Sequence, residues 1–252
     1  MTAPAPVLEV SDLRKSFGAV AALRGVSFTV GAGEVLAMIG PNGAGKSTCF
    51  AVLGGQLRPD GGRVALLGRD VTGARPATLW RRGVGRTFQV TETFASMTAR
   101  ENVQVALLAH ARRTWRFGRP AARRFGAEAE ALLRMVGLGE QAGRAAGALA
   151  YGDVKRLDLA VALASRPRLL LMDEPTAGMA GGERRAMMRL VRQVVAEQGV
   201  SVLFTEHDMD AVFGTADRVI VLHRGAVIAE GPPDRVRADA RVREAYLGAA
   251  WC

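Results

Sequence analysis

Residues 40–48 read Gly-Pro-Asn-Gly-Ala-Gly-Lys-Ser-Thr, in which a glycine is followed by four residues, a second glycine, a lysine and a serine. Glycines let such a loop turn tightly, so that backbone N–H groups approach the oxygens of a bound phosphate. In this pattern Lys46 is placed to reach the β- and γ-phosphates of a nucleotide, and Ser47 to hold Mg²⁺. A nucleotide site is therefore predicted at Gly40, Pro41, Asn42, Gly43, Ala44, Gly45, Lys46, Ser47 and Thr48.

Two acidic residues later in the chain could act on the same phosphates. Asp173 and Glu174 follow the apolar run 169–172, which is typical of a buried parallel strand. Ligands bind at the carboxyl ends of strands in open α/β sheets. Asp173 is then placed to orient Mg²⁺ through water, and Glu174 to take a proton from an attacking water. A strand capped by two soluble acids is the alternative, and the phosphate loop upstream favours the chemical interpretation.

The elements that must position these residues alternate between strands and helices. An apolar strand over residues 34–39 precedes the phosphate loop, and a helix over 47–53 follows it. Further strands are predicted over residues 7–10, 26–30, 64–68, 169–172, 200–204 and 219–222, and further helices over 128–136, 153–164, 183–198 and 234–247. This order predicts an α/β fold with a mainly parallel sheet, an antiparallel β region near the N-terminus and an inserted all-helical lobe.

Composition and charge narrow the class of protein. The 252 residues contain no apolar run near the ~18 residues of a membrane span and no basic-then-apolar secretory signal at the N-terminus. Two cysteines, Cys49 and Cys252, form no disulfide framework, which fits a reducing cytoplasm; Cys49 is expected to be a small buried hydrophobe. The net charge is +10, and arginines alternate with aromatics over residues 112–124. That run is interpreted as a solvated loop near a membrane partner, or alternatively as a nucleic-acid contact.

The order of further motifs resembles the ATPase subunit of ATP-binding-cassette (ABC) transporters. Gln89 matches the glutamine loop of that family, and residues 149–153, Leu-Ala-Tyr-Gly-Asp, stand where its Leu-Ser-Gly-Gly-Gln signature is expected. His207 follows a strand as the switch histidine of the family does, and Phe17 stands where the family has an aromatic that stacks on adenine. Each has an ordinary alternative: a polar turn residue for Gln89, a structural histidine for His207 and a core aromatic for Phe17.

The resemblance implies a P-loop NTPase core, RecA-like, and a role for each matching residue. It implies catalysis by Glu174, His207, Lys46 and Gln89, and coordination of Mg²⁺ by Ser47, Gln89 and Asp173. In the family, ATP lies between the phosphate loop of one subunit and the signature loop of another. Besides the phosphate loop, ATP would therefore contact Phe17 in one subunit and, in the second, Ala150, Tyr151, Gly152 and Asp153.

The signature departs from its commonest form at three positions. Ala150 replaces serine, Tyr151 replaces the first glycine and Asp153 replaces glutamine; Asp153 is expected to point away from phosphate because like charges repel. Ala180 stands where many members carry aspartate, which puts communication between the two ATP sites through that loop in doubt. The variant signature, together with Glu-Pro-Thr-Ala-Gly-Met after Asp173, is similar to subunits that import branched-chain and other hydrophobic amino acids.

The resemblance further implies the organisation of the chain and its partners. One ABC ATPase domain would span residues 1–252: a β subdomain and the first part of the core over 1–88, the helical lobe over 89–164, and the second part of the core over 165–252. Partners would be a second ATPase subunit, identical or a sister chain, two transmembrane permease subunits and, indirectly, a solute-binding protein, at the cytoplasmic face of the membrane. Two alternatives are a soluble ATP switch acting on nucleic acid or ribosomes, supported by the charge and the arginine–aromatic run, and a partner subunit that does not hydrolyse ATP, suggested by the altered signature.

Overall fold

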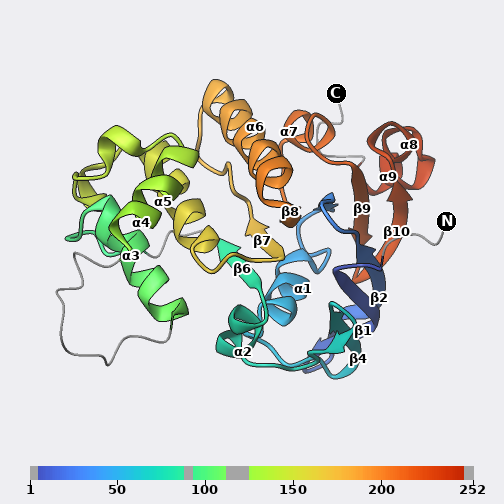
Figure 1. The fold of residues 1–252 in the computed structure, drawn as a ribbon. Helices are drawn as coiled ribbons and strands as arrows, with labels where there is room; N and C mark the ends of the chain where they lie inside the picture. Colours follow the sequence, from blue (N-terminus) through green and yellow to red (C-terminus); the bar gives the residue numbers. More distant parts are fainter. Residues whose placement is uncertain (1–4, 88–92, 112–124, 247–252) are drawn as a thin grey trace.

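A six-stranded sheet forms the centre of the computed structural model, which describes residues 5–87, 93–111 and 125–246 (Figure 1). Its strand order is β10-β9-β3-β8-β7-β6, and only β10 runs antiparallel to its neighbour. The strands are β3 (Val35–Ile39), β6 (Val84–Thr87), β7 (Leu169–Asp173), β8 (Ser201–Thr205), β9 (Arg218–His223) and β10 (Ala226–Gly231). The carboxyl ends of β3, β7 and β8 therefore meet at one edge of the sheet.

The N-terminal part of the chain forms a second, antiparallel sheet with the order β2-β1-β4-β5. It contains β1 (Leu8–Phe17), β2 (Val20–Val30), β4 (Gly61–Leu66) and β5 (Arg69–Asp70). The strands predicted over 7–10 and 26–30 are only the ends of β1 and β2. The rest was missed because the β1–β2 pairing changes register three times, which disrupts the apolar alternation. The predicted strand 64–68 extends too far, since Leu67 and Gly68 have φ angles of 50° and 74° and form the turn to β5.

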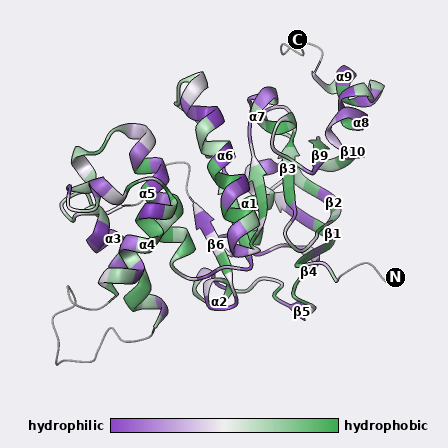
Figure 2. Ribbon diagram, turned by 45° about the horizontal axis from the view of Figure 1, so that its top comes forward, coloured by the Kyte–Doolittle hydropathy of each residue, from purple (hydrophilic) through white to green (hydrophobic). Residues whose placement is uncertain are grey.

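Both faces of the central sheet are covered, which explains the uninterrupted apolar runs of its strands. Along β3, Val35, Ala37 and Ile39 belong to one hydrophobic cluster, which includes residues of α5 (Tyr151–Leu163) and α6 (Gly181–Gln198). Leu36 and Met38 belong to the other cluster, with residues of α1 (Lys46–Leu53) and the antiparallel sheet. Figure 2 shows the hydrophobic residues concentrated on these central strands.

Three helices stand together beside the sheet: α3 (Ala99–His110), α4 (Gly126–Met135) and α5 (Figure 1). The hydroxyl of Thr98 accepts the N–H of Glu101 at 3.2 Å, while the Glu101 carboxylate accepts the N–H of Thr98 at 2.8 Å, so this reciprocal pair fixes the start of α3. The segment between α4 and α5 contains two short 3₁₀ helices, Gly139–Gln141 and Ala146–Ala148. The remaining short helices of the described chain are α2 (Pro76–Arg81), α7 (Met209–Phe213), α8 (Pro233–Ala238) and α9 (Ala240–Tyr246).

The single helix predicted over residues 234–247 is wrong. It is divided into α8 and α9 at Asp239, whose backbone is extended. The Asp239 carboxylate accepts the backbone N–H of Arg241 at 2.9 Å and pairs with its guanidinium at 2.7 Å. These contacts lower the pKa of Asp239 to about 2. A side chain that binds the backbone two residues further on competes with helical hydrogen bonding, which accounts for the break.

Candidate nucleotide site

The phosphate loop links the carboxyl end of β3 to the first turn of α1. The loop folds back on itself where the N–H of Ala44 donates to the carbonyl of Pro41 at 3.1 Å. Gly45 caps α1 with a φ of 106°, and a Cβ at this position would lie 2.6 Å from the carbonyl oxygen of Ala22. Only glycine fits there, so the tight turn places the N-terminus of an eight-residue helix at the loop.

Lys46 is nearly buried beneath this loop. Its Nζ donates to the carbonyl of Gly40 at 2.6 Å and to that of Pro41 at 3.3 Å. Burial lowers the pKa of Lys46, and the charges of Glu174 and Asp173 oppose that shift. A charged group held in a partly desolvated position interacts strongly with an anion, so this ammonium is suited to a phosphate.

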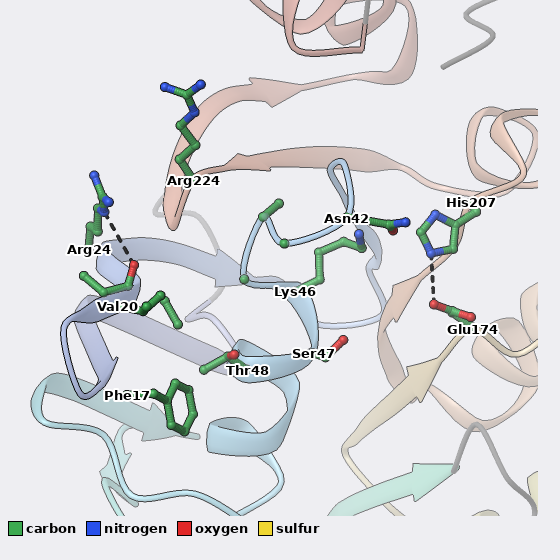
Figure 3. A pocket seen from close by; sticks show the side chains of 15 residues that line it. Phe17, Val20, Arg24, Asn42, Lys46, Ser47, Thr48, Glu174, His207 and Arg224 are labelled. Carbon is green, nitrogen blue, oxygen red and sulfur yellow. Dashed lines mark hydrogen bonds and ion pairs between the residues drawn. The ribbon is translucent and has the colours of Figure 1, made fainter. Parts of the chain in front are cut away.

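The loop forms one side of a pocket of about 460 Å³ (Figure 3). Phe17 lies at one end, 49% exposed, with Lys15 Nζ 5.7 Å from its ring centroid, whereas Glu174 and His207 lie at the other end. An aromatic at one end and cations and carboxylates at the other suit a nucleotide with its base and its phosphates apart. The lining residues are Phe17, Val20, Ala21, Ala22, Arg24, Asn42, Gly43, Ala44, Gly45, Lys46, Ser47, Thr48, Glu174, His207 and Arg224.

The two predicted acids stand at the end of β7, where they have different surroundings. Asp173 Oδ1 accepts the hydroxyl of Thr205, the last residue of β8, at 2.7 Å. Glu174 has a left-handed φ of 49°, and its N–H is bonded to the carbonyl and the hydroxyl of Thr205 at 3.2 and 3.1 Å. These bonds turn the chain so that Glu174, but not Asp173, lines the pocket.

His207 meets Glu174 across the two strand ends. Its Nε2 lies 2.9 Å from Glu174 Oε1, and both side chains line the pocket that contains Lys46 (Figure 3). The pairing of Asp173 with Thr205 brings these side chains together, because Asp173 directly precedes Glu174 and Thr205 stands two residues before His207. The arrangement places a carboxylate, an imidazole and an ammonium around one space, which suits electrostatic stabilisation of a reacting phosphate.

Glu206 holds the segment after β7 in place, a role that the sequence analysis missed. Its side chain is 4% exposed, and Oε1 accepts the N–H of Thr176 at 2.8 Å and its hydroxyl at 2.6 Å. Oε2 accepts the N–H of His207 at 3.1 Å. In the sequence, the only sign of this role is that Glu206 directly precedes His207. The direction in which its side chain points depends on the packing of β7 against β8.

Arg24 and Arg224 were also missed, although both line the pocket. The N–H of Arg24 donates to the carbonyl of Gly225 at 2.8 Å, and the N–H of Gly225 donates to that of Ala44 at 2.9 Å. These bonds attach the β9–β10 turn to both β2 and the phosphate loop. Because the contact joins distant segments, no local sequence pattern predicts it.

The remaining predicted residues lie elsewhere. Gln89 and the arginine–aromatic run 112–124 fall outside the described residues. Ala150, Tyr151, Gly152 and Asp153 lie at the start of α5 and do not line this pocket. The Asp153 carboxylate pairs with Arg156 at 3.8 Å. Cys49 is fully buried in α1, and burial raises the pKa of its thiol to about 12, as expected for a hydrophobic position.

A glycine loop between a parallel strand and a helix, facing an acid and a histidine at the neighbouring strand ends, defines a P-loop nucleotide-binding protein of the α/β class. Comparisons with known proteins give the family. The model of the ABC transporter family matches residues 23–177, and that of the branched-chain amino acid ATP-binding cassette transporter matches residues 226–251.

Three individual proteins are similar to this chain over nearly all of its length. The high-affinity branched-chain amino acid transport ATP-binding protein BraF of Pseudomonas aeruginosa is 41% identical over 97% of this chain and 99% of its own. The crystal structure of MJ1267, an ATP-binding cassette of an ABC transporter in its ADP conformation, has a TM-score of 0.87 at 33% identity, covering 97% and 99% of the two chains. A dimeric post-hydrolysis state of the cassette MJ0796, bound to ADP and Pi, has a TM-score of 0.76 at 26% identity, covering 90% and 98%.

The chain therefore belongs to the ABC transporter family and is an ATP-binding-cassette ATPase. Its α/β fold with a P-loop core, as predicted, is confirmed. Within the described residues no helix is both long enough and apolar enough to cross a membrane.

Proposed function

We propose that this chain is the ATP-hydrolysing subunit of an importer for branched-chain or related amino acids. The similarity to BraF extends from end to end, and the C-terminal residues 226–251 match a family model specific to branched-chain amino acid cassettes. The relatives reported above support transport and not a nucleic-acid switch. A non-hydrolysing role finds no support in the pocket, which holds a carboxylate suited to act as a base.

The observation that carries the chemical part of the proposal is the contact of 2.9 Å between His207 Nε2 and Glu174 Oε1 in the pocket of Lys46. Glu174 takes a proton from the attacking water, and His207 both orients that carboxylate and contacts the γ-phosphate. Lys46 and the backbone N–H groups of residues 40–48 stabilise the charge on the phosphate oxygens. Phe17 stacks on the base.

The donors near the phosphate loop fit Mg²⁺. Ser47 lines the pocket in the first turn of α1, and Asp173 ends β7 at the same edge of the sheet. Both are hard oxygen donors of the kind that this ion prefers. Ser47 would hold the ion directly and Asp173 through water, with Gln89 as a further candidate outside the described residues. Bound there, Mg²⁺ neutralises charge on the β- and γ-phosphates.

The partners belong to the same proposal. A second ATPase subunit, a copy or a sister chain, supplies residues 150–153 to the nucleotide; the dimeric state of MJ0796 supports such pairing. Two permease subunits hold the pair at the cytoplasmic face of the membrane as a peripheral component, and an external solute-binding protein delivers the amino acid.

The test starts by searching the genes that neighbour this one for two permeases and a binding protein, and then co-expresses the chain with those found. We expect the chain to co-purify with both permeases and, in proteoliposomes, to hydrolyse ATP faster when the binding protein carries leucine, isoleucine or valine. Hydrolysis stimulated by nucleic acid instead, with binding that weakens steeply as salt rises, would replace the transport proposal by the soluble switch.

A further inference from the structure

Tyr151, which replaces a glycine of the usual signature, contacts a loop that the nucleotide site depends on. It begins α5, and its side chain is 52% exposed. Its hydroxyl donates to the carbonyl of Ala177 at 3.0 Å. Ala177 stands three residues after Glu174, in the loop 174–180 that connects β7 to α6.

The ring of Tyr151 rests on a position that has no side chain. Gly178 has a φ of 79°, and a Cβ there would lie 3.2 to 3.4 Å from the Cε1, Oη and Cζ atoms of the tyrosine. Gly152, beside Tyr151, faces α6 and the same loop at ordinary contact distance: a Cβ there would lie 3.5 Å from Glu183 Oε1 and 3.7 Å from Met179 Cε. The first turn of α5 and the loop 174–180 therefore pack together through glycines on both sides, and the added tyrosine fills the space over Gly178.

The same loop is held from its other side by Glu206. As described above, that carboxylate accepts both hydrogen-bond donors of Thr176, while its second oxygen accepts the N–H of His207. Two neighbouring residues, Thr176 and Ala177, are thus attached to the residue that follows β8 and to the first residue of α5, respectively. Glu174 lies two residues before Thr176, and its carboxylate contacts His207.

We propose that Tyr151 is a positioning residue that clamps the loop 174–180 to α5 and so fixes Glu174 against His207. This inference rests on the proposed function of Glu174, and it assigns a structural connection between the signature segment and the hydrolytic carboxylate within one chain. A movement of α5 then reaches Glu174 through a hydrogen bond to Ala177 and through the ring on Gly178. The clamp thus connects α5 to the loop 174–180, in which Ala180 stands in place of the aspartate that many family members carry.

The test compares Tyr151→Phe with wild type in the full-length chain, because this variant removes only the hydroxyl. The matched control is Ser165→Ala, which also removes a single hydroxyl that donates to a backbone carbonyl, that of Ala162 at 3.2 Å, at the far end of the same helix. Two loop amides report on the clamp by hydrogen exchange: Ala177, which donates to Glu174 O at 3.1 Å, and Met179, which donates to Thr176 O at 3.1 Å.

In Tyr151→Phe we expect exchange of these two amides to accelerate about fivefold, as the loss of one net hydrogen bond predicts, with no change in Ser165→Ala. We expect kcat for ATP to fall about fivefold while the Kd for ATP changes less than twofold, because the base is misplaced and the phosphate loop is intact.

Unchanged exchange in Tyr151→Phe would overturn the clamp. Faster exchange with an unchanged kcat would overturn the positioning role and leave a contact of stability alone. If wild type shows no hydrolysis stimulated by amino acid, the proposed function fails, whereas the exchange comparison still decides whether the hydroxyl holds the loop.

Discussion

The phosphate loop and the signature segment 149–153 are both proposed to bind phosphate, and they differ in how much of a binding site each forms within one chain. The loop is built by one chain: its carbonyls hold Lys46, its N–H groups lie at a helix N-terminus, and the β9–β10 turn supports it. The signature segment does not line the pocket beside that loop. Its Tyr151 is half exposed, and its contacts lead backwards, to the loop 174–180.

The difference indicates which half of the site a single chain can complete. A buried cation and a fixed turn give the phosphate loop its shape before a ligand arrives, so binding costs little reorganisation. The signature segment is held by the loop 174–180 on one side and is exposed on the other. This is the arrangement expected of a surface that binds the nucleotide of a second subunit. Substitutions in the two regions should therefore affect different steps.

The largest effect is expected for Glu174→Gln, which removes the proposed base between the two regions. Turnover is expected to fall about 1,000-fold, within the range for loss of a general base, while ATP binding is retained and an ATP-bound dimer accumulates. Single-turnover hydrolysis and size-exclusion chromatography with ATP measure both. The exposed Glu197→Gln is the control, and near wild-type turnover in Glu174→Gln would remove this residue from the role of base.

Lys46→Ala tests the assignment of the phosphate loop as a nucleotide-binding element. Removing a charge-assisted contact to phosphate is expected to raise the Kd for ATP about 100-fold. Equilibrium binding of a fluorescent ATP analogue measures this, with Arg63→Ala as a control that removes an exposed charge paired with Asp70. An unchanged Kd would contradict the assignment of the loop.

Gly178→Ala addresses the clamp from the side of the loop. Its left-handed φ and that of Gly199, 63°, make alanine costly by about 1 kcal/mol at either site, but a Cβ at Gly199 meets nothing within 4 Å. Both variants are expected to lose similar thermal stability, and only Gly178→Ala is expected to lose turnover, about fivefold, because its Cβ presses on Tyr151. Equal turnover in the two variants would separate Gly178 from the nucleotide site.

The smallest effect is expected for Asp153→Gln, which restores the common signature residue. Asp153 pairs with Arg156 on its own helix, a partly exposed pair of the kind worth less than about 1 kcal/mol. ATP binding to a single chain is expected to change less than twofold. If Asp153 instead faced the partner's nucleotide, Asp153→Gln would relieve their repulsion, and dimer formation with ATP would strengthen severalfold. Analytical ultracentrifugation with ATP measures the second quantity.

Much of the site follows from the sequence, because its strongest features are local. The glycine spacing around Lys46 and the apolar strand before Asp173 are set by backbone geometry over fewer than ten residues. The helix after residue 180 ends as predicted at Gly199, whose left-handed conformation caps it. The helix predicted over 234–247 was wrong because Asp239 forms backbone contacts that a periodic pattern does not reveal.

The sequence by itself determined that a strand, a glycine loop and a helix form an anion site, and that acids stand at the end of a second strand. Only the tertiary structure decided which acid turns into the pocket, since the bonds from Glu174 to Thr205 depend on the pairing of β7 with β8. It likewise decided that Arg24 and Arg224 line the pocket and that Tyr151 rests on Gly178. Local patterns fix backbone conformation over short spans, whereas contacts between distant segments arise only when the sheet is assembled and its faces are packed.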